Sequence, residues 1–287
     1  MAVTVSQLGE LGELSPIAIR VPERTFKNDL RAMKIVWHRD VIRFWRDRPR
    51  MAASLLQPVL YLFVFGTGMA SMIPSARGVD LKTFLFPGVL SMSVLFTCFF
   101  SAGSMVWDRE FGFMREMLVA PVRRWSIVVG KCLGGATAGA VQGVLVIALA
   151  GLVGVPYAPG LIATLLGELV LLSFSITALG VLVAIRIRTI QSFMAIVQML
   201  IMPLFFLSGA LYPLTGLPPW LAILTKLDPL TYVVDPMRRA VFEALGRSVP
   251  GVTWGGAAVP VSAELGVVVL CAAVALGIAT VQFSKGE

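Results

Sequence analysis

The sequence predicts an all-α polytopic membrane protein with six transmembrane helices, an N-terminal amphipathic helix in the membrane interface, and short extracellular helices before the last span. Hydrophobic residues make up 57% of the 287 residues and charged residues only 14%, and the mean hydropathy is +0.85. Soluble domains, by comparison, are about 45–50% apolar and about 25% charged. The apolar residues also gather into runs of the roughly 20 residues that a helix needs to cross a membrane.

Six apolar runs are the predicted spans, at about residues 51–71, 84–107, 126–150, 160–185, 192–212 and 262–283. Segments on the cytoplasmic side of a membrane carry an excess of Lys and Arg. Of the 24 basic residues, 18 lie in the N-terminal arm or on the same side of the spans, and 6 lie on the other side. We therefore expect both termini in the cytoplasm, with a cytoplasmic arm at 1–50 and a six-span domain at 51–287.

The cytoplasmic arm is expected to form an amphipathic helix from Phe26 onward. Basic residues occupy other faces of this helix than its apolar residues, which is typical of a helix that lies in the membrane interface. The apolar residues at helical spacing are Phe26, Leu30, Met33, Trp37, Val41, Phe44 and Trp45. The formal net charge of +8 fits contact with anionic lipids better than nucleic-acid binding, because the basic residues gather on one side of the spans.

The connection between the fifth and sixth spans is expected to contain two short helices that pack against the membrane domain. The second of them is predicted to start at Asp228-Pro229, as an N-cap followed by proline, and to be kinked or split at Pro236. Its apolar stripe from Leu230 to Leu245 would have no role in a solvated loop. Whether these helices re-enter the membrane stays open.

The most informative segment is 108–124, which holds seven charged residues between two apolar runs. If it is a helix, Met114 and Phe111 share an apolar face that could fit a groove in a partner protein, while the charges fix its register. The alternative is a solvated loop, but the mixed signs favour a protein partner over lipid. The residues expected to contact that partner are Asp108, Arg109, Glu110, Phe111, Met114, Arg115 and Glu116.

The chain resembles the type-2 ABC export permeases, and within them the daunorubicin/doxorubicin-resistance type. The resemblance extends from about residue 26 to the end of the chain. The residues that carry it are Asp108-Arg109-Glu110, Arg115-Glu116, Ala120-Pro121, Arg123-Arg124, Gly130-Lys131, Phe86-Pro87-Gly88, Pro203 through Trp220, and Asp228-Pro229.

The resemblance implies the transmembrane subunit of an ATP-driven exporter in the plasma membrane of a bacterium. Its partners would be two copies of an ABC ATP-binding subunit and a second permease half, either identical or related. The substrate would be an amphipathic drug, a lipid or a lipid-linked glycan. The segment at 108–124 would then couple the ATP-binding subunit to the membrane domain.

The sequence contains no phosphate-binding loop of the G-x-x-x-x-G-K-[ST] type, because Cys132 follows Gly130-Lys131. We therefore expect ATP and Mg²⁺ to bind the partner subunit, and this chain to have no catalytic residue, cofactor or metal site of its own. A secondary transporter driven by an ion gradient is the alternative. That class normally carries several charged residues inside its spans, whereas Glu168 is nearly alone here.

Four polar residues in the predicted spans are candidates for the transport pathway: Glu168, Gln57, Gln142 and Gln198. An ionisable residue within a membrane is costly and suggests function, so Glu168 could contact substrate or pair with Gln142 or Lys131. The glutamines could equally be hydrogen-bonding partners between helices. Rows of glycine in the third span (Gly130, Gly134, Gly135, Gly139 and Gly143) predict close helix packing, within the protomer rather than between protomers.

Overall fold

In the computed structural model, which describes residues 25–70, 81–114, 117, 122–254 and 257–285, six helices are long and apolar enough to cross a membrane. Helix α1 (Phe26–Arg46) precedes them. The spans are α2 (Arg48–Val59) with π-helical turns at Leu60–Phe65 and α3 (Gly66–Ala70); α4 (Leu81–Ala102) with α5 (Ser104–Glu110); α7 (Arg124–Ile147); α8 (Pro159–Ala184); α9 (Ile190–Leu207); and α12 (Val261–Lys285). The predicted fold class is confirmed.

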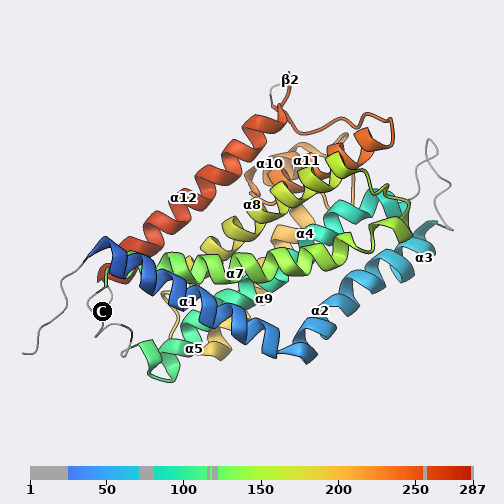
Figure 1. Cartoon of the computed structure of the whole chain (residues 1–287). Coiled ribbons are helices and arrows are strands. Elements are labelled where there is room, and N and C mark those ends of the chain that lie inside the picture. Colours follow the sequence, from blue (N-terminus) through green and yellow to red (C-terminus); the bar gives the residue numbers. More distant parts are fainter. Residues whose placement is uncertain (1–24, 71–80, 115–116, 118–121, 255–256, 286–287) are drawn as a thin grey trace, which may run out of the picture.

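The remaining elements lie mainly between the last two spans. A 3-10 turn at Ala150–Val153 follows α7, and helices α10 (Pro219–Leu227) and α11 (Thr231–Ala244) follow α9. Strands β1 (Thr253–Trp254) and β2 (Ala257–Ala258) pair antiparallel before α12. Figure 1 shows α1 at one end of the bundle, beside the end of α12, whereas α10 and α11 lie toward the other end. We call these the α1 end and the α11 end.

Helix α7 packs closely between α4 and α8 because glycines, which have no side chain, line one of its faces. A Cβ atom added at Gly139 would lie 2.3 Å from Sγ of Cys98, and one at Gly143 would lie 2.2 Å from Cδ1 of Leu169. These distances leave no room for a side chain larger than hydrogen. The predicted packing of the glycine rows within the protomer is therefore confirmed.

The second glycine row of α7 receives α1. Gly130 contacts the backbone of Met33, and Gly134 contacts the side chain of Asp40. The buried residues of α1 are Asp29, Val36 and Asp40, whereas Phe26 and Leu30 of the predicted apolar face are exposed. The helix is amphipathic as expected, and the face that packs on α7 carries two carboxylates together with Trp37, whose indole N–H donates to the hydroxyl of Thr137, 3.0 Å away.

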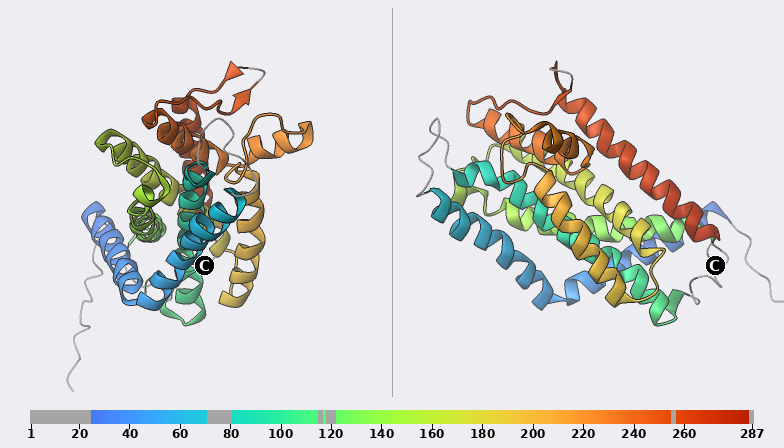
Figure 2. Two further views of the ribbon diagram at one scale, coloured as in Figure 1. Left: turned by 90° about the vertical axis from the view of Figure 1, so that its right-hand side faces the viewer. Right: turned by 180° about the vertical axis from the view of Figure 1, so that it is seen from behind.

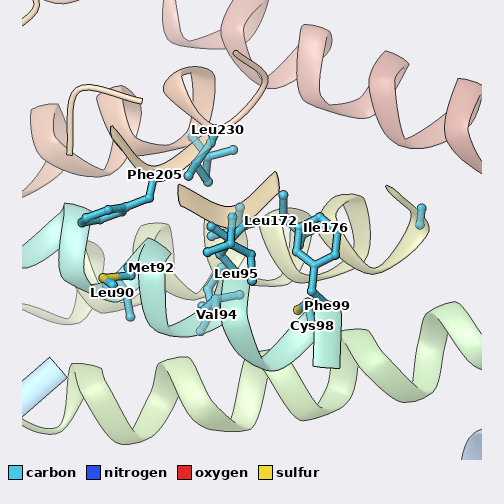
Figure 3. Packing of buried hydrophobic residues seen from close by; sticks show 14 of the residues in the cluster. Leu90, Met92, Val94, Leu95, Cys98, Phe99, Leu172, Ile176, Phe205 and Leu230 are labelled. Carbon is cyan, nitrogen blue, oxygen red and sulfur yellow. The ribbon is translucent and has the colours of Figure 1, made fainter. Parts of the chain in front are cut away.

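Side chains of α4 and α8 form the centre of the apolar core. Figure 3 shows Leu95 and Phe99 of α4 beside Leu172 and Ile176 of α8. By contrast, only 17% of the most apolar window of the first span and 22% of that of α9 is buried, compared with 78% in the second span. Figure 2 shows the spans running roughly parallel to one another. The rest of the chain leaves broad apolar faces of the first and fifth spans uncovered.

Helices α10 and α11 together form what we call the cap. Helix α11 begins at Thr231, and the Asp228 carboxylate accepts a hydrogen bond from the backbone N–H of Leu230, 2.9 Å away. The predicted start at Asp228-Pro229 is thus two residues early. Of the predicted kink or split at Pro236, the split does not occur: Pro236 lies inside α11, and the helix continues to Ala244.

Candidate functional site

A buried ion-pair network joins the end of the second span to α1 and α7. The ammonium group of Lys131 on α7 lies 2.6 Å from Oδ2 of Asp108 on α5 and 3.1 Å from Oδ1 of Asp40 on α1. Lys131 also donates to the hydroxyl of Ser104, 3.0 Å away, and Arg39 of α1 pairs with Asp108. Both carboxylates and the ammonium group are almost fully buried, so each charge depends on the others for compensation.

The two residues after Asp108 hold the connection between α8 and α9. The guanidinium of Arg109 donates to the carbonyl oxygens of Ile185 and Ile187 at 2.7 and 3.1 Å, where α8 ends. The carboxylate of Glu110 accepts a hydrogen bond of 2.8 Å from the backbone N–H of Ile190, the first residue of α9. A cation at a helix C-terminus and an anion at a helix N-terminus both match the helix dipole.

Three consecutive charged residues therefore contact four different helices. Asp108 binds α1 and α7, Arg109 binds the end of α8, and Glu110 binds the start of α9. A rotation or translation of α5 would act on all four at once. The sequence indicated these residues as a group, but their contacts within the chain were not predicted.

The interpretation of 108–124 as one helix does not hold at its start, because the helix is interrupted there. Helix α5 ends at Glu110, and Gly112 has a φ of +83°, a left-handed conformation that interrupts the helix and favours glycine. Beyond this turn, Met114 is buried. Arg115 and Glu116, also expected to contact a partner, lie outside the described residues.

Aromatic side chains are exposed around this turn. Phe111 is 59% exposed and Phe113 is 53% exposed, and the ring of Phe111 stacks on Trp107 with centroids 4.9 Å apart. Exposed aromatic residues next to charged ones are enriched at sites where proteins bind one another. This surface lies at the α1 end, beside the contacts of Asp108, Arg109 and Glu110.

A cavity of about 740 Å³ opens at the same end of the molecule, between the first, second and fifth spans and the end of α1. Its wall includes the pathway candidate Gln57, together with Ser104 and Asp40 of the ion-pair network. Because the first and fifth spans are poorly covered by the rest of the chain, the cavity lies next to the exposed apolar faces.

The other pathway candidates lie elsewhere. Gln142 is buried and accepts a hydrogen bond of 3.0 Å from the hydroxyl of Ser54, and Gln198 is exposed on α9. Glu168 is 4% exposed, and one of its carboxylate oxygens has no hydrogen-bond partner among the described residues. Its predicted pairing with Lys131 or Gln142 is not observed, because Lys131 is bound to Asp40 and Asp108.

A second polar cluster, which the sequence did not indicate, lies at the α11 end. Arg239 on α11 pairs with Asp235 and with Glu264 of α12, and donates to the carbonyl of Val259 at 3.0 Å. The spacing of Asp235 and Arg239, four residues apart on one helix, was a usable signal for this pair. The cluster fixes the cap to the start of the last span.

Two cap residues have pKa values shifted by burial. Burial raises the pKa of Asp228 to about 7, although the hydrogen bond from Leu230 acts in the opposite direction. Burial also lowers the pKa of Arg238 to about 10, while Asp235 acts to raise it. The Arg238 guanidinium donates to the carbonyl oxygens of Gly209 and Ala210 at 2.6 and 3.2 Å, so it holds the end of the fifth span against α11.

Comparison with known proteins agrees with this arrangement. Residues 31–242 match the family model described as ABC-2 type transporter. The chain is 32% identical over 193 residues to the putative transport permease ycf38 of Cyanophora paradoxa, a match that covers 66% of each chain. It is also 30% identical over 212 residues to the inner membrane transport permease YadH of Escherichia coli K12, covering 72% of this chain and 81% of that one.

A third relative is the nodulation protein J of Rhizobium leguminosarum bv. trifolii, which is 27% identical over 207 residues, covering 71% of this chain and 78% of that one. The matched segment contains the ion-pair network, α5, and the helices that Arg109 and Glu110 hold. The chain therefore belongs to the ABC-2 type transporter family of membrane permeases.

Proposed function

We propose that this chain is the permease subunit of an ABC exporter, in which a separate ATP-binding subunit drives the outward movement of an amphipathic drug, lipid or lipid-linked glycan. The observation that carries the proposal is the position of Asp108, Arg109 and Glu110. They connect the end of one span to four other helices, directly beside an exposed aromatic surface. A partner that binds this surface can move several spans together.

In this mechanism the ATP-binding subunit, which holds ATP and Mg²⁺, docks on Phe111 and Phe113. When nucleotide binding moves that subunit, the displacement passes through α5 to α1 and α7 by way of Asp108. It passes to α8 and α9 by way of Arg109 and Glu110. Such a change requires contacts that differ between two states, and ion pairs and helix caps can supply them.

A second permease half, identical or related, would cover the first and fifth spans. Their apolar faces are the least buried of the membrane helices: Met199 on α9 is 78% exposed and Val64 on the first span is 65% exposed. Two halves that meet there would enclose their two cavities in one pathway, with two ATP-binding subunits below. Gln57 and the Ser54–Gln142 pair would then lie on or near that pathway.

The orientation that we propose places the α1 end in the cytoplasm of a bacterial cell and the cap outside. In a variant without native cysteines, Ser248→Cys, at an exposed position after α11, should react with a membrane-impermeant thiol reagent on intact cells. Arg188→Cys, between α8 and α9, should react only after the cells are opened. Labelling of the second variant alone on intact cells would reverse the orientation.

The coupling role is tested by replacing both exposed phenylalanines, Phe111 and Phe113, with serine. Because these side chains are more than half exposed, we expect the permease to insert and fold normally. Recovery of the ATP-binding subunit on affinity purification should fall at least roughly tenfold, since clustered aromatic anchors often contribute 2 kcal/mol or more to an interface. ATP-driven export should fall with it.

Trp254→Ser is the matched control, because this residue is 56% exposed at the α11 end. It should leave both association and export unchanged. Normal association and export by the doubly substituted variant would show that the aromatic surface is not the docking site. If no ATP-binding subunit accompanies the wild-type chain, the ion-gradient alternative replaces the proposed function.

A further inference from the structure

The cavity between the first, second and fifth spans has a wall of mixed character. Along the second span, hydroxyl groups face it at intervals of four residues, at Ser93, Thr97 and Ser101. A neighbouring row carries the rings of Phe96 and Phe100, whose centroids are 6.1 Å apart. An amphipathic wall of this kind, inside a membrane domain, suits a ligand that is itself amphipathic.

Two arginines stand at the cytoplasmic mouth of this cavity, each held against an aromatic ring. The guanidinium carbon of Arg50 lies 5.0 Å from the ring centroid of Phe100, and that of Arg43 lies 5.6 Å from the ring of Trp107. Among the described residues, neither guanidinium forms a salt bridge or donates a hydrogen bond. A guanidinium stacked on a ring keeps its N–H groups free for a phosphate or carboxylate in its plane.

The carboxylates on the cavity wall do not cancel these charges. Asp40 pairs with Lys131, which compensates its negative charge, and it accepts a hydrogen bond from the hydroxyl of Ser104. Asp47 accepts a hydrogen bond of 3.3 Å from the backbone N–H of Arg50 and caps α2. Because Lys131 compensates Asp40, the charges that remain on the wall are two arginines and one aspartate. This net positive charge favours an anion over a cation.

We propose that the cavity binds an amphiphile whose polar end is anionic, a phosphate or a carboxylate. The acidic group lies between Arg43 and Arg50, and the apolar part lies along Phe96 and Phe100. This inference rests on the proposed function and narrows its substrate class. A cationic drug would lose the contact with both arginines and would meet like charges at the mouth.

The test uses the wild-type chain in nanodiscs of zwitterionic lipid, without an ATP-binding subunit. The probes are three molecules with the same dibrominated alkyl chain and different polar ends: an alkyl phosphate, an alcohol and an amine. Bromine quenches tryptophan fluorescence at short range, and Trp107 lines the cavity. We expect saturable quenching with the phosphate at least roughly tenfold tighter than with the alcohol, and weakest with the amine. Trp107→Phe should remove that part of the signal.

Two matched double variants distinguish binding in the cavity from attraction by surface charge. Arg43→Gln with Arg50→Gln, and Arg46→Gln with Arg48→Gln, remove the same charge from the same segment, but only the first pair lines the cavity. The first double variant should lose the phosphate preference roughly tenfold, and the second should change affinity less than about twofold. Lysine at positions 43 and 50 should retain most of the preference, which controls for folding.

Equal losses in the two double variants would show that the arginines attract lipid only by surface charge, and the proposal would fail. It would also fail if the amine bound best, or if Trp107→Phe left the quenching intact. None of these results depends on the ATP-binding subunit. If the binding test fails while the ATP-binding subunit still associates normally, only the substrate class is overturned. If the binding test succeeds but no ATP-binding subunit associates, the proposed function is overturned.

Discussion

Replacement of Lys131 by methionine is expected to lower the stability of the chain by about 3–5 kcal/mol, the usual cost of removing one partner from a buried ion pair. Lys131 is 2% exposed and lies within ion-pair distance of both Asp40 and Asp108. Methionine fills a similar volume but leaves two buried carboxylates with only the half-exposed Arg39 beside them. The measurement is the thermal unfolding midpoint of the purified protein in detergent.

A control variant and a compensating double variant accompany this measurement. Lys34→Met removes a lysine from the exposed side of α1 and should change the midpoint little. Combining Lys131→Met with Asp108→Asn restores the charge balance and should recover part of the loss, because one unpaired carboxylate is removed. An unchanged midpoint for Lys131→Met alone would contradict the view that the network holds α1 against the membrane domain.

The same network shows how much of the candidate site could be predicted. A cluster of charges in an apolar chain is visible in any sequence, and it drew attention to Asp108, Arg109 and Glu110, which contact four helices in the structure. The partners of Arg109 and Glu110 are backbone carbonyl and N–H groups at Ile185 and Ile190, which have no signature in the sequence. The left-handed turn at Gly112 was also missed, because an isolated glycine inside a helical pattern does not reveal its φ angle.

One available signal was overlooked on α1. Asp29, Val36 and Asp40 are separated by seven and four residues, which places them on one helix face, and all three are buried. The prediction of an interfacial helix rested on its apolar and basic residues and made no use of the acidic ones. Here the basic residues of the neighbouring chain segments, Lys131 and Arg123, compensate the acidic face, so burial of the two aspartates is sustained.

The spans were predictable because hydrocarbon demands long apolar helices, but their ends depend on local geometry. The fifth predicted span, 192–212, continues through apolar residues, whereas α9 ends at Leu207. Gly209 has a φ of +70°, and the chain turns there so that Ala210 packs against Gly88. A Cβ on Gly88 would lie 2.5 Å from the carbonyl oxygen of Ala210, a long-range contact that hydropathy cannot reveal.

The apolar stripe of α11 was predicted to be buried, and the structure confirms it. Val234 and Val241 are fully buried, and α11 contacts α4, α8 and α12. Two adjacent residues of α11 hold the cap to the spans: Arg238 binds the end of the fifth span, and Arg239 binds Glu264 at the start of the sixth. Movement of either span must therefore move α11, and in the proposed exporter the cap would respond to the opening of the pathway.

Aspartate at either Val234 or Val241 is expected to destabilise the protein by about 4 kcal/mol or more, because each change buries a carboxylate with no partner and removes a packed side chain. Where protein survives in the membrane, we expect ATP hydrolysis to be uncoupled from export, since the cap would no longer follow both spans. The measurements are the unfolding midpoint in detergent and export per ATP hydrolysed in reconstituted vesicles.

Two control variants change exposed positions instead. Ala244→Asp adds the same charge at an exposed position of α11, and Arg247→Ala removes an exposed positive charge, so both should change the midpoint and export little. If both buried aspartates left the midpoint and export unchanged, and external protease cut α11 readily, the cap would not be a packed element in the membrane-embedded protein.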